Sequence, residues 1–232
     1  MEYVYPREGY HTAILGTTGS GKSTLAAHTV SRAPFHLRPQ FIIDIKHEEI
    51  FAQCQRIVEI GIRDKLPTQP GLYITRPRPD ELEDIEAWLS RLWEQGNAGL
   101  YIDESYLMPD KAWLRNVLAQ GRSLGITVIA ASQRPVDVPR SVFTEASYIS
   151  IFRLNDEKDL QRVREFTPRK MLSAKPGADY EWPLPDFHSF WYSNKHHKSG
   201  DPFPYAILAP VPTAEKIVEF IDTRLRPRHS LI

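Results

Sequence analysis

An octapeptide near the start of the 232-residue chain has the residue types and spacing that phosphate binding requires. Its members are Gly16, Thr17, Thr18, Gly19, Ser20, Gly21, Lys22 and Ser23, with Thr24 following in an expected helix. They fit the pattern G-x-x-x-x-G-K-[ST] between an apolar strand and a helix start. The glycines let backbone amides bend around phosphate oxygens, and the positive helix N-terminus faces the same anion. Residues 16–24 are therefore predicted to bind a nucleoside triphosphate, with Lys22 on its β- and γ-phosphates and Ser23 on Mg²⁺.

A pair of acidic residues later in the chain is suited to nucleotide hydrolysis. Asp103 and Glu104 end an apolar run, residues 99–104, that is typical of a strand. In doubly wound sheets the carboxyl ends of strands border the ligand crevice. Asp103 is predicted to hold Mg²⁺, and Glu104 to act as the general base that polarises the attacking water. A solvated acidic strand end is the alternative, which the octapeptide upstream disfavours.

A third polar element, Ser132 and Gln133, follows the apolar run at residues 126–131. If that strand lies between the strand of the octapeptide and the strand of Asp103, Gln133 lies near the γ-phosphate. Glutamines in other NTPases sense this phosphate or orient water there. An inserted strand of this kind is typical of the additional-strand class of NTPases with a catalytic glutamate. A plain exit from strand to loop is the alternative.

Apolar runs and amphipathic segments predict the elements that position these groups. Buried strands are expected at residues 11–16, 41–45, 72–74, 99–104, 126–131 and 148–152, and an edge strand at 187–192. Helices are expected at 21–31, 109–123, 213–225 and 80–95, the last with Asp80 as N-cap and Glu83 completing a capping box. This alternation favours an α/β fold with a mostly parallel sheet covered by helices on both faces. From about residue 167 the sequence becomes rich in proline and aromatic residues. We therefore predict an ATPase core at residues 1–166 and a C-terminal extension at residues 167–232.

The composition is that of a soluble globular protein, with 41% hydrophobic and 25% charged residues. Because 29 basic and 29 acidic residues give a formal net charge of zero, any contact with nucleic acid must be local. Cys54 is the only cysteine, which excludes an intrachain disulfide and fits a reducing compartment; we expect it to be packed. No apolar run approaches the roughly 20 residues that span a bilayer, and the N-terminus has no signal core, so we expect a cytosolic chain without a transmembrane segment.

Several stretches together resemble the HerA/FtsK superfamily of ring-forming, DNA-pumping ATPases. In chain order they are His11 with the octapeptide, the element Asp44-Ile45-Lys46, the run from Gly121 to Pro135 with Ser132 and Gln133, and residues 152–159. Only ten residues precede His11, which leaves no room for an N-terminal β-barrel of the HerA type. The membrane spans and winged helix of FtsK-type proteins are not visible either. The chain is therefore most similar to the small genome-packaging ATPases of icosahedral viruses with an internal membrane.

This resemblance implies a RecA-like P-loop NTPase fold that binds ATP and Mg²⁺. It implies ATP-driven translocation of double-stranded DNA, without sequence preference, by a homo-hexameric ring that packages a viral genome. Partners at a capsid or membrane vertex, and a location in the host cytoplasm and at the virion vertex, are expected with it. The resemblance also implies an arginine finger supplied in trans. Arg122 is preferred to Arg115 and Arg153, because it precedes a strand where a subunit edge is expected; a surface charge is the alternative for each.

Other polar and aromatic residues have less specific interpretations. Pore-facing loops are expected to grip DNA phosphates, with Arg134, Arg140, Lys65 and Lys111 as unranked candidates that are alternatively solvated loop residues. An aromatic group in the extension is interpreted as its core in preference to a base-stacking platform; its members are Trp182, Phe187, Phe190, Trp191 and Tyr192. His196 and His197 lack partner ligands at metal spacing and are expected in a loop.

Other functions remain open at this point. A helicase or conjugative coupling ATPase of the same superfamily is one alternative, although such proteins usually carry further domains. A nucleotide-dependent module that assembles at a capsid vertex without pumping DNA is another. A small-molecule kinase is more distant, since it needs an acceptor pocket and lid arginines.

Overall fold

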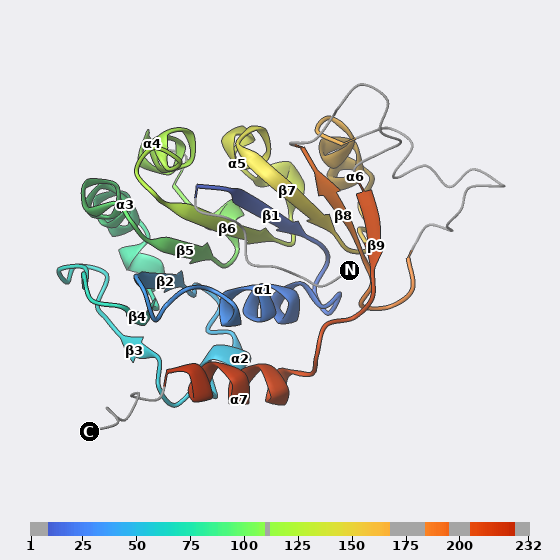
Figure 1. Ribbon diagram of the computed structural model, residues 1–232. Helices are drawn as coiled ribbons and strands as arrows, with labels where there is room; N and C mark the ends of the chain where they lie inside the picture. Colours follow the sequence, from blue (N-terminus) through green and yellow to red (C-terminus); the bar gives the residue numbers. More distant parts are fainter. Residues whose placement is uncertain (1–8, 110–111, 168–183, 195–204, 226–232) are drawn as a thin grey trace, which may run out of the picture.

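One nine-stranded sheet runs through the part of the chain that the computed structural model describes, residues 9–109, 112–167, 184–194 and 205–225. The strands are β1 His11–Leu15, β2 Pro39–Ile43, β3 Val58–Glu59, β4 Gly71–Thr75, β5 Gly99–Ile102, β6 Thr127–Ser132, β7 Ala146–Ile151, β8 Ser189–Ser193 and β9 Tyr205–Leu208. Their order is β3-β4-β2-β5-β6-β1-β7-β8-β9 (Figure 1). The strands β1 to β7 pair in parallel, whereas β8 and β9 run antiparallel to their neighbours. The predicted mostly parallel sheet is confirmed.

Helices cover both faces of this sheet (Figure 1). One face carries α1 Lys22–Ser31, α2 Glu49–Ala52 and α7 Ala214–Arg224, and the other carries α3 Asp84–Gln95, α4 Ala112–Gln120, α5 Arg140–Thr144 and α6 Glu157–Arg164. Three short 3₁₀ turns complete the order: η1 Pro79–Glu81, η2 Ser105–Leu107 and η3 Pro135–Asp137. None of the helices in these ranges has the length and apolar character needed to cross a membrane.

Two hydrophobic clusters, one on each face, explain why the central strands are apolar throughout. Along β5, Leu100 and Ile102 pack into the cluster under α3 and α4, whereas Tyr101 between them packs into the cluster under α1. Successive side chains of a strand point to opposite faces, so a strand covered on both sides needs apolar residues at every position. Trp88 of α3 is fully buried and meets Phe41 of β2 edge to face, with 5.4 Å between ring centroids. This packing fixes the central strands, whose carboxyl ends carry the predicted site.

Two local expectations were wrong. The predicted helix over residues 80–95 is interrupted: η1 comes first and α3 begins at Asp84, so Asp80 is not its N-cap. Instead, the Glu81 carboxylate accepts a hydrogen bond from the backbone N–H of Arg78 at 3.0 Å, which caps the turn at Arg78, directly before Pro79. The strand expected at the edge, 187–192, is β8, and β9 covers it. The proline-bordered apolar run of β9 is too short to give a clear periodic signal.

The described part of the C-terminal extension joins both the sheet and one helical layer. Ile217 and Ile221 of α7 pack into the cluster that contains α1. The Asp222 carboxylate accepts hydrogen bonds at 3.1 Å from the backbone N–H groups of Gln55 and Arg56. Cys54 beside them is buried as expected, and burial, helped by the charge of Asp222, raises the pKa of its thiol to about 12. The boundary at residue 167 stays a prediction, and Trp182, His196, His197 and Lys111 lie outside the described residues.

Truncation of Ile221 tests how far α7 stabilises the core. Ile221 is fully buried, so we expect Ile221→Ala to lower the free energy of unfolding by roughly 2–5 kcal/mol, measured by urea denaturation. Glu219→Ala, at an exposed position of the same helix, is the control and is expected to change stability by less than about 0.5 kcal/mol. Equal unfolding midpoints for the two variants would show that α7 does not contribute to the fold.

Candidate active site

The phosphate-binding octapeptide forms the turn between β1 and α1, and hydrogen bonds tie it to neighbouring strands. The backbone N–H of Gly16 donates to the carbonyl of Ser132 at 3.2 Å, and that of Thr17 donates to the carbonyl of Arg153 at 3.0 Å. A Cβ atom on Gly16 would lie 2.6 Å from the Phe152 Cβ and 2.6 Å from the Ser20 Oγ, so only glycine fits there. Gly21 has a φ of 98°, a backbone conformation that glycine adopts without strain. The conformation of the turn is therefore fixed by its glycines and by hydrogen bonds to the neighbouring strands.

A cavity of about 300 Å³ lies over this turn. From the predicted nucleotide-binding residues it is lined by Thr17, Thr18, Gly19, Gly21, Lys22, Ser23 and Thr24, and it is also lined by Lys46, Glu48 and Phe187. Lys22 is 4% exposed. The hydroxyl of Ser20 is buried with no hydrogen-bond partner among the described residues. The octapeptide thus forms the wall of a cavity with a buried lysine at its base, as predicted for a triphosphate site.

Asp103 and Glu104 follow β5 directly, and both are fully buried. Glu104 has a φ of 51° and a ψ of 55°, in the left-handed region that non-glycine residues rarely adopt. Its carboxylate forms ion pairs with Lys22, at 3.5 Å, and with Lys46. Its second oxygen accepts a hydrogen bond from the backbone N–H of Gln133 at 3.3 Å. Strain of this kind persists where surrounding contacts fix the conformation, and it is concentrated at functional sites.

The carboxyl group of Asp103 is suited to bind a cation. Burial raises its pKa to about 7, with the charge of Lys22 opposing this rise and the carboxylates of Glu48, Glu104 and Asp44 adding to it. One oxygen accepts a hydrogen bond from the Tyr101 hydroxyl at 3.2 Å, while the other is buried without a partner among the described residues. A divalent cation bound to Asp103 would compensate the buried negative charge and would also give the second oxygen a partner.

Ser23, the other predicted metal ligand, is connected to Asp103 through Glu48. The Ser23 hydroxyl donates a hydrogen bond to the Glu48 carboxylate at 2.8 Å, and the charge of Glu48 acts on Asp103. Within the described ranges no group of three or more His, Cys, Asp or Glu side chains is arranged to hold a metal ion. Ser23 and Asp103 therefore fit Mg²⁺ in the way nucleotide sites usually do, with substrate phosphates and water completing the ligands.

Gln133 links the octapeptide to the acidic turn after β5. The Thr18 hydroxyl donates to the side-chain oxygen of Gln133 at 2.5 Å, and the Gln133 amide donates to the Tyr106 hydroxyl at 3.3 Å. This arrangement arises because β6 lies between β1 and β5, as predicted. Gln133 therefore joins Thr18 of the octapeptide to Tyr106 in the 3₁₀ turn after Glu104.

The three candidate finger arginines lie in different places. Arg122 precedes β6 and is thus at the opposite end of that strand from Gln133, with its guanidinium 5.4 Å from the centroid of the Tyr10 ring. Arg115 is exposed on α4. Arg153 lies beside the octapeptide, because its carbonyl binds Thr17, and its guanidinium is 3.4 Å from the Asp186 carboxylate. Within one chain, the preferred candidate Arg122 therefore lies at the opposite end of β6 from the cavity, and its action in trans stays a prediction.

The candidate DNA-contacting residues that the structure describes lie at the surface. Arg134 pairs with Asp137 at 2.9 Å, and Arg140 pairs with Glu165 at 3.6 Å. Lys65 is exposed. Their contact with DNA stays a prediction.

The aromatic residues of the extension divide into two groups. Phe190 and Tyr192 of β8 are buried in the core, and Trp191 stacks on Tyr148 of β7 with 5.1 Å between centroids. For Phe190 and Tyr192 the interpretation as core is confirmed, whereas Trp191 is half-buried and packs on the sheet. For Phe187 it was wrong, since this ring is 56% exposed and lines the phosphate cavity.

Sequence reasoning also missed two charged residues at the same edge of the sheet as the site. Glu48 was not a candidate, and neither was Arg76, which pairs with Asp44 at 3.0 Å and with Glu59 at 2.7 Å. The backbone N–H of Glu48 donates to Asp44 at 2.8 Å, which places Glu48 over the cavity. The strands β4, β2 and β5 are parallel neighbours, so the residues that follow them, including Arg76 after β4 and Glu48 after β2, meet at one edge of the sheet. That strand order was the signal that could have found them.

The buried Lys22–Glu104 pair, the phosphate-binding turn and the position of β6 define a P-loop ATPase of the additional-strand, catalytic-glutamate class. The chain is 30% identical over 233 residues to "DNA packaging ATPase P9" of Enterobacteria phage PRD1, across 97% of this chain and 98% of that protein. It belongs to the family of that packaging ATPase. No protein-family model matches the chain.

Solved structures confirm the expected fold. The genome packaging NTPase B204 of Sulfolobus turreted icosahedral virus 2, in complex with AMPPCP, is similar with a TM-score of 0.67 and 18% identity, over 88% of this chain and 99% of that one. VirB4 of Thermoanaerobacter pseudethanolicus is similar with a TM-score of 0.65 and 12% identity, over 89% of this chain and 91% of that one. The resemblance to viral packaging ATPases is confirmed by the 30% identity to the phage PRD1 protein, and the solved structures show the same fold.

The raised pKa of Asp103 predicts how the stability of the wild type and of Asp103→Asn will differ with pH. The prediction is for protein free of nucleotide and metal. Because this pKa is about 7 in the folded state against an ordinary 3.8, folding takes up a proton between these values, and stability falls as the pH rises through them. We expect Asp103→Asn to remove this loss and to be more stable than the wild type by up to about 4 kcal/mol above pH 7. Urea denaturation in EDTA from pH 5 to 8.5 measures it. A stability difference that did not grow between pH 5 and 7 would contradict the assignment.

Proposed function

We propose that this chain hydrolyses ATP at Lys22 and Glu104 to translocate double-stranded DNA during the packaging of a viral genome. The observation that carries the proposal is the buried Glu104 carboxylate, placed 3.5 Å from the lysine of the phosphate-binding turn. Membership of the packaging-ATPase family over 97% of the chain supports the choice of DNA as the polymer.

Each side chain of the site has a defined task in this reaction. The loop amides and Lys22 bind the β- and γ-phosphates, and Glu104 orients and deprotonates the attacking water. Ser23 and Asp103 would hold Mg²⁺, which supplies neutralisation of phosphate charge when bound.

Lys46 is a positioning residue for Glu104. Burial opposes the charged form of Lys46, but the hydrogen bond and charge of Glu104 raise its pKa, so Lys46 stays protonated. When Lys22 turns to the phosphates, Lys46 still holds the Glu104 carboxylate in place.

The position of Gln133 supports a role in reporting the γ-phosphate. A phosphate over the turn would compete for the Thr18 hydroxyl that now donates to Gln133. Release of that hydrogen bond frees Gln133 to contact the phosphate or water, while its backbone N–H remains on Glu104. Gln133 thus couples the occupancy of the cavity to the end of β6 and to the loop that carries Arg134.

The same proposal includes an assembly. Six copies form a ring in which Arg122 of one subunit reaches the nucleotide of the next, and Arg134, Arg140, Lys65 and Lys111 face the DNA. Non-specific contacts with phosphates suit a pump that must move any sequence. The ring docks at a capsid or membrane vertex, acting in the host cytoplasm and then at the virion vertex.

Substitution of the two central residues tests hydrolysis and its coupling to DNA. We expect Lys22→Ala and Glu104→Gln each to lower DNA-stimulated phosphate release by roughly 10²–10⁴-fold, because they remove phosphate binding and the general base. Glu104→Gln is expected to keep ATP binding, measured by calorimetry, whereas Lys22→Ala loses it. Glu145→Gln, at an exposed position after α5, is the matched control and keeps full turnover. If duplex DNA left wild-type turnover unchanged at every salt concentration, the translocase proposal would be abandoned.

Mixed rings test whether Arg122 acts in trans. We expect Arg122→Ala alone to lower turnover by at least about 100-fold, because an arginine finger contributes strongly to phosphoryl transfer. Mixing it with inactive Lys22→Ala subunits restores activity, since an intact turn then receives Arg122 from its neighbour. Phosphate release across a range of mixing ratios measures this.

Arg115→Ala and Arg153→Ala are the controls for this experiment. Both stay active on their own if Arg122 is the finger. Mixing with Lys22→Ala subunits could instead restore activity to Arg115→Ala or Arg153→Ala but not to Arg122→Ala. The finger would then be the arginine substituted in the restored variant.

A further inference from the structure

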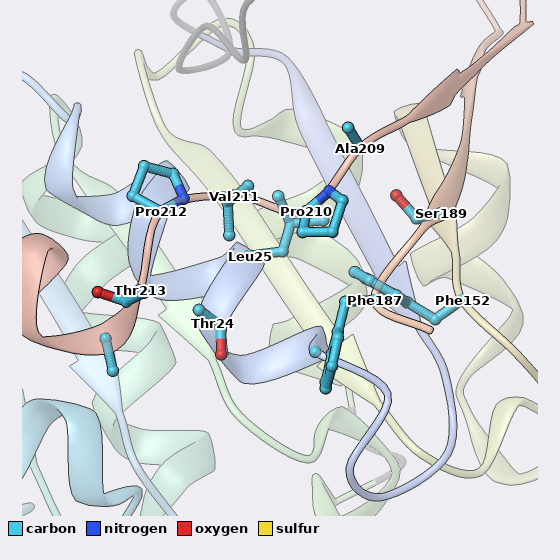
Figure 2. A pocket seen from close by; sticks show the side chains of 12 residues that line it. Thr24, Leu25, Phe152, Phe187, Ser189, Ala209, Pro210, Val211, Pro212 and Thr213 are labelled. Carbon is cyan, nitrogen blue, oxygen red and sulfur yellow. The ribbon is translucent and has the colours of Figure 1, made fainter. Parts of the chain in front are cut away.

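A second cavity, of about 320 Å³, adjoins the phosphate cavity (Figure 2). The two cavities share Gly21, Thr24 and Phe187 in their linings, so they meet around the start of α1. The volume is at the lower end of the range of small-molecule pockets, roughly 300–1,000 Å³. The second cavity therefore has the size and position of a compartment for another part of the same ligand.

The lining of this cavity is apolar and comes from both ends of the chain. Leu25 of α1 faces the segment that joins β9 to α7, where Pro210, Val211 and Pro212 run past the start of α1 (Figure 2). Among the described residues that line it, no side chain is charged, and the polar ones are the hydroxyls of Thr24, Ser189 and Thr213. An apolar compartment next to a phosphate site suits an uncharged ring.

Phe187 stands where the two cavities meet. Its ring is 56% exposed although the neighbouring aromatics of β8 are packed, and its φ of 61° lies in the left-handed region that bulky residues rarely adopt. Two contacts hold the turn around it: the backbone N–H of His188 donates to the carbonyl of Pro185 at 3.1 Å, and the Asp186 carboxylate pairs with Arg153. A strained, exposed aromatic ring at the mouth of an apolar cavity is explained by a planar ligand that stacks on it.

We propose that this cavity binds the purine ring of the nucleotide, stacked on Phe187 and closed by residues 210–212. The proposal rests on the proposed function, because it requires a triphosphate on the turn at residues 16–23. It gives the C-terminal extension a direct part in substrate binding.

The lining also predicts weak discrimination between purines. Adenine and guanine differ in the donors and acceptors at their edges, and strong selection needs buried polar groups that one base would leave unpaired. This cavity offers three side-chain hydroxyls, and Pro210 and Pro212 have no backbone N–H to donate. ATP and GTP are therefore expected to bind with affinities within about tenfold of each other.

Calorimetric titration of the full chain with MgATP, MgGTP and magnesium tripolyphosphate tests the proposal. Tripolyphosphate occupies only the phosphate cavity, so it separates the two compartments. Val211→Trp fills the apolar cavity, and Phe187→Ala removes the stacking surface; each is expected to weaken MgATP binding at least about tenfold. Neither changes the affinity for tripolyphosphate. Phe187→Tyr keeps the stacking and the affinity, and Val58→Trp, at an exposed position on the distant β3, is the control for the added bulk.

The outcomes separate this inference from the proposed function. Unchanged MgATP affinity in both Val211→Trp and Phe187→Ala, with the wild type binding ATP, overturns the base pocket alone. A wild type that binds neither MgATP nor tripolyphosphate overturns the proposed function. A more than 100-fold preference for one purine overturns the weak discrimination. If Phe187→Ala lost affinity for tripolyphosphate as well as for ATP, Phe187 would contact the phosphates, and the stacking role would be overturned.

Discussion

The site depends on one interaction, the fully buried Glu104 carboxylate compensated by two lysines. A buried charge without partners costs several kcal/mol, so the acidic turn after β5 is stable only while at least one lysine remains in contact. Lys22 is also the residue that a phosphate would attract. The ion pair therefore makes a bound phosphate and Glu104, the proposed general base, compete for the same lysine, with Lys46 present to compensate Glu104 when Lys22 leaves.

Strand order is what makes this interaction possible. Lys22 follows β1 and Glu104 follows β5, and β6 between them supplies a backbone carbonyl for Gly16 and a backbone N–H for Glu104. A parallel sheet brings all three carboxyl ends to one edge, where the α1 N-terminus adds its positive end. Because both faces of the sheet are covered, these strand ends are rigid and the buried charges are shielded from water.

The parts of this site that local pattern encodes were predictable from sequence. The turn at residues 16–23 and the acidic pair Asp103 and Glu104 each lie within one short segment, next to an apolar strand that identifies them. Glu48 and Phe187 were missed because their roles arise from contacts between distant segments, and no local periodicity reports such contacts. Arg122 is a different case: its proposed role lies across a subunit boundary, so contacts within one chain cannot identify it.

The role of the C-terminal extension was the hardest to predict from the sequence pattern. Its contacts connect it to the phosphate site through α1. The first turn of α1 carries Lys22, and the same helix packs against α7 through the cluster that includes Ile217 and Ile221. Packed interiors compress little and transmit displacement. Any shift of α1 on phosphate binding or release would therefore be passed to α7 and to the segment at residues 209–213 that precedes it. If the base binds as proposed, this segment borders the nucleotide and leads directly into α7, which is the placement needed to carry a hydrolysis signal to the surface of the subunit.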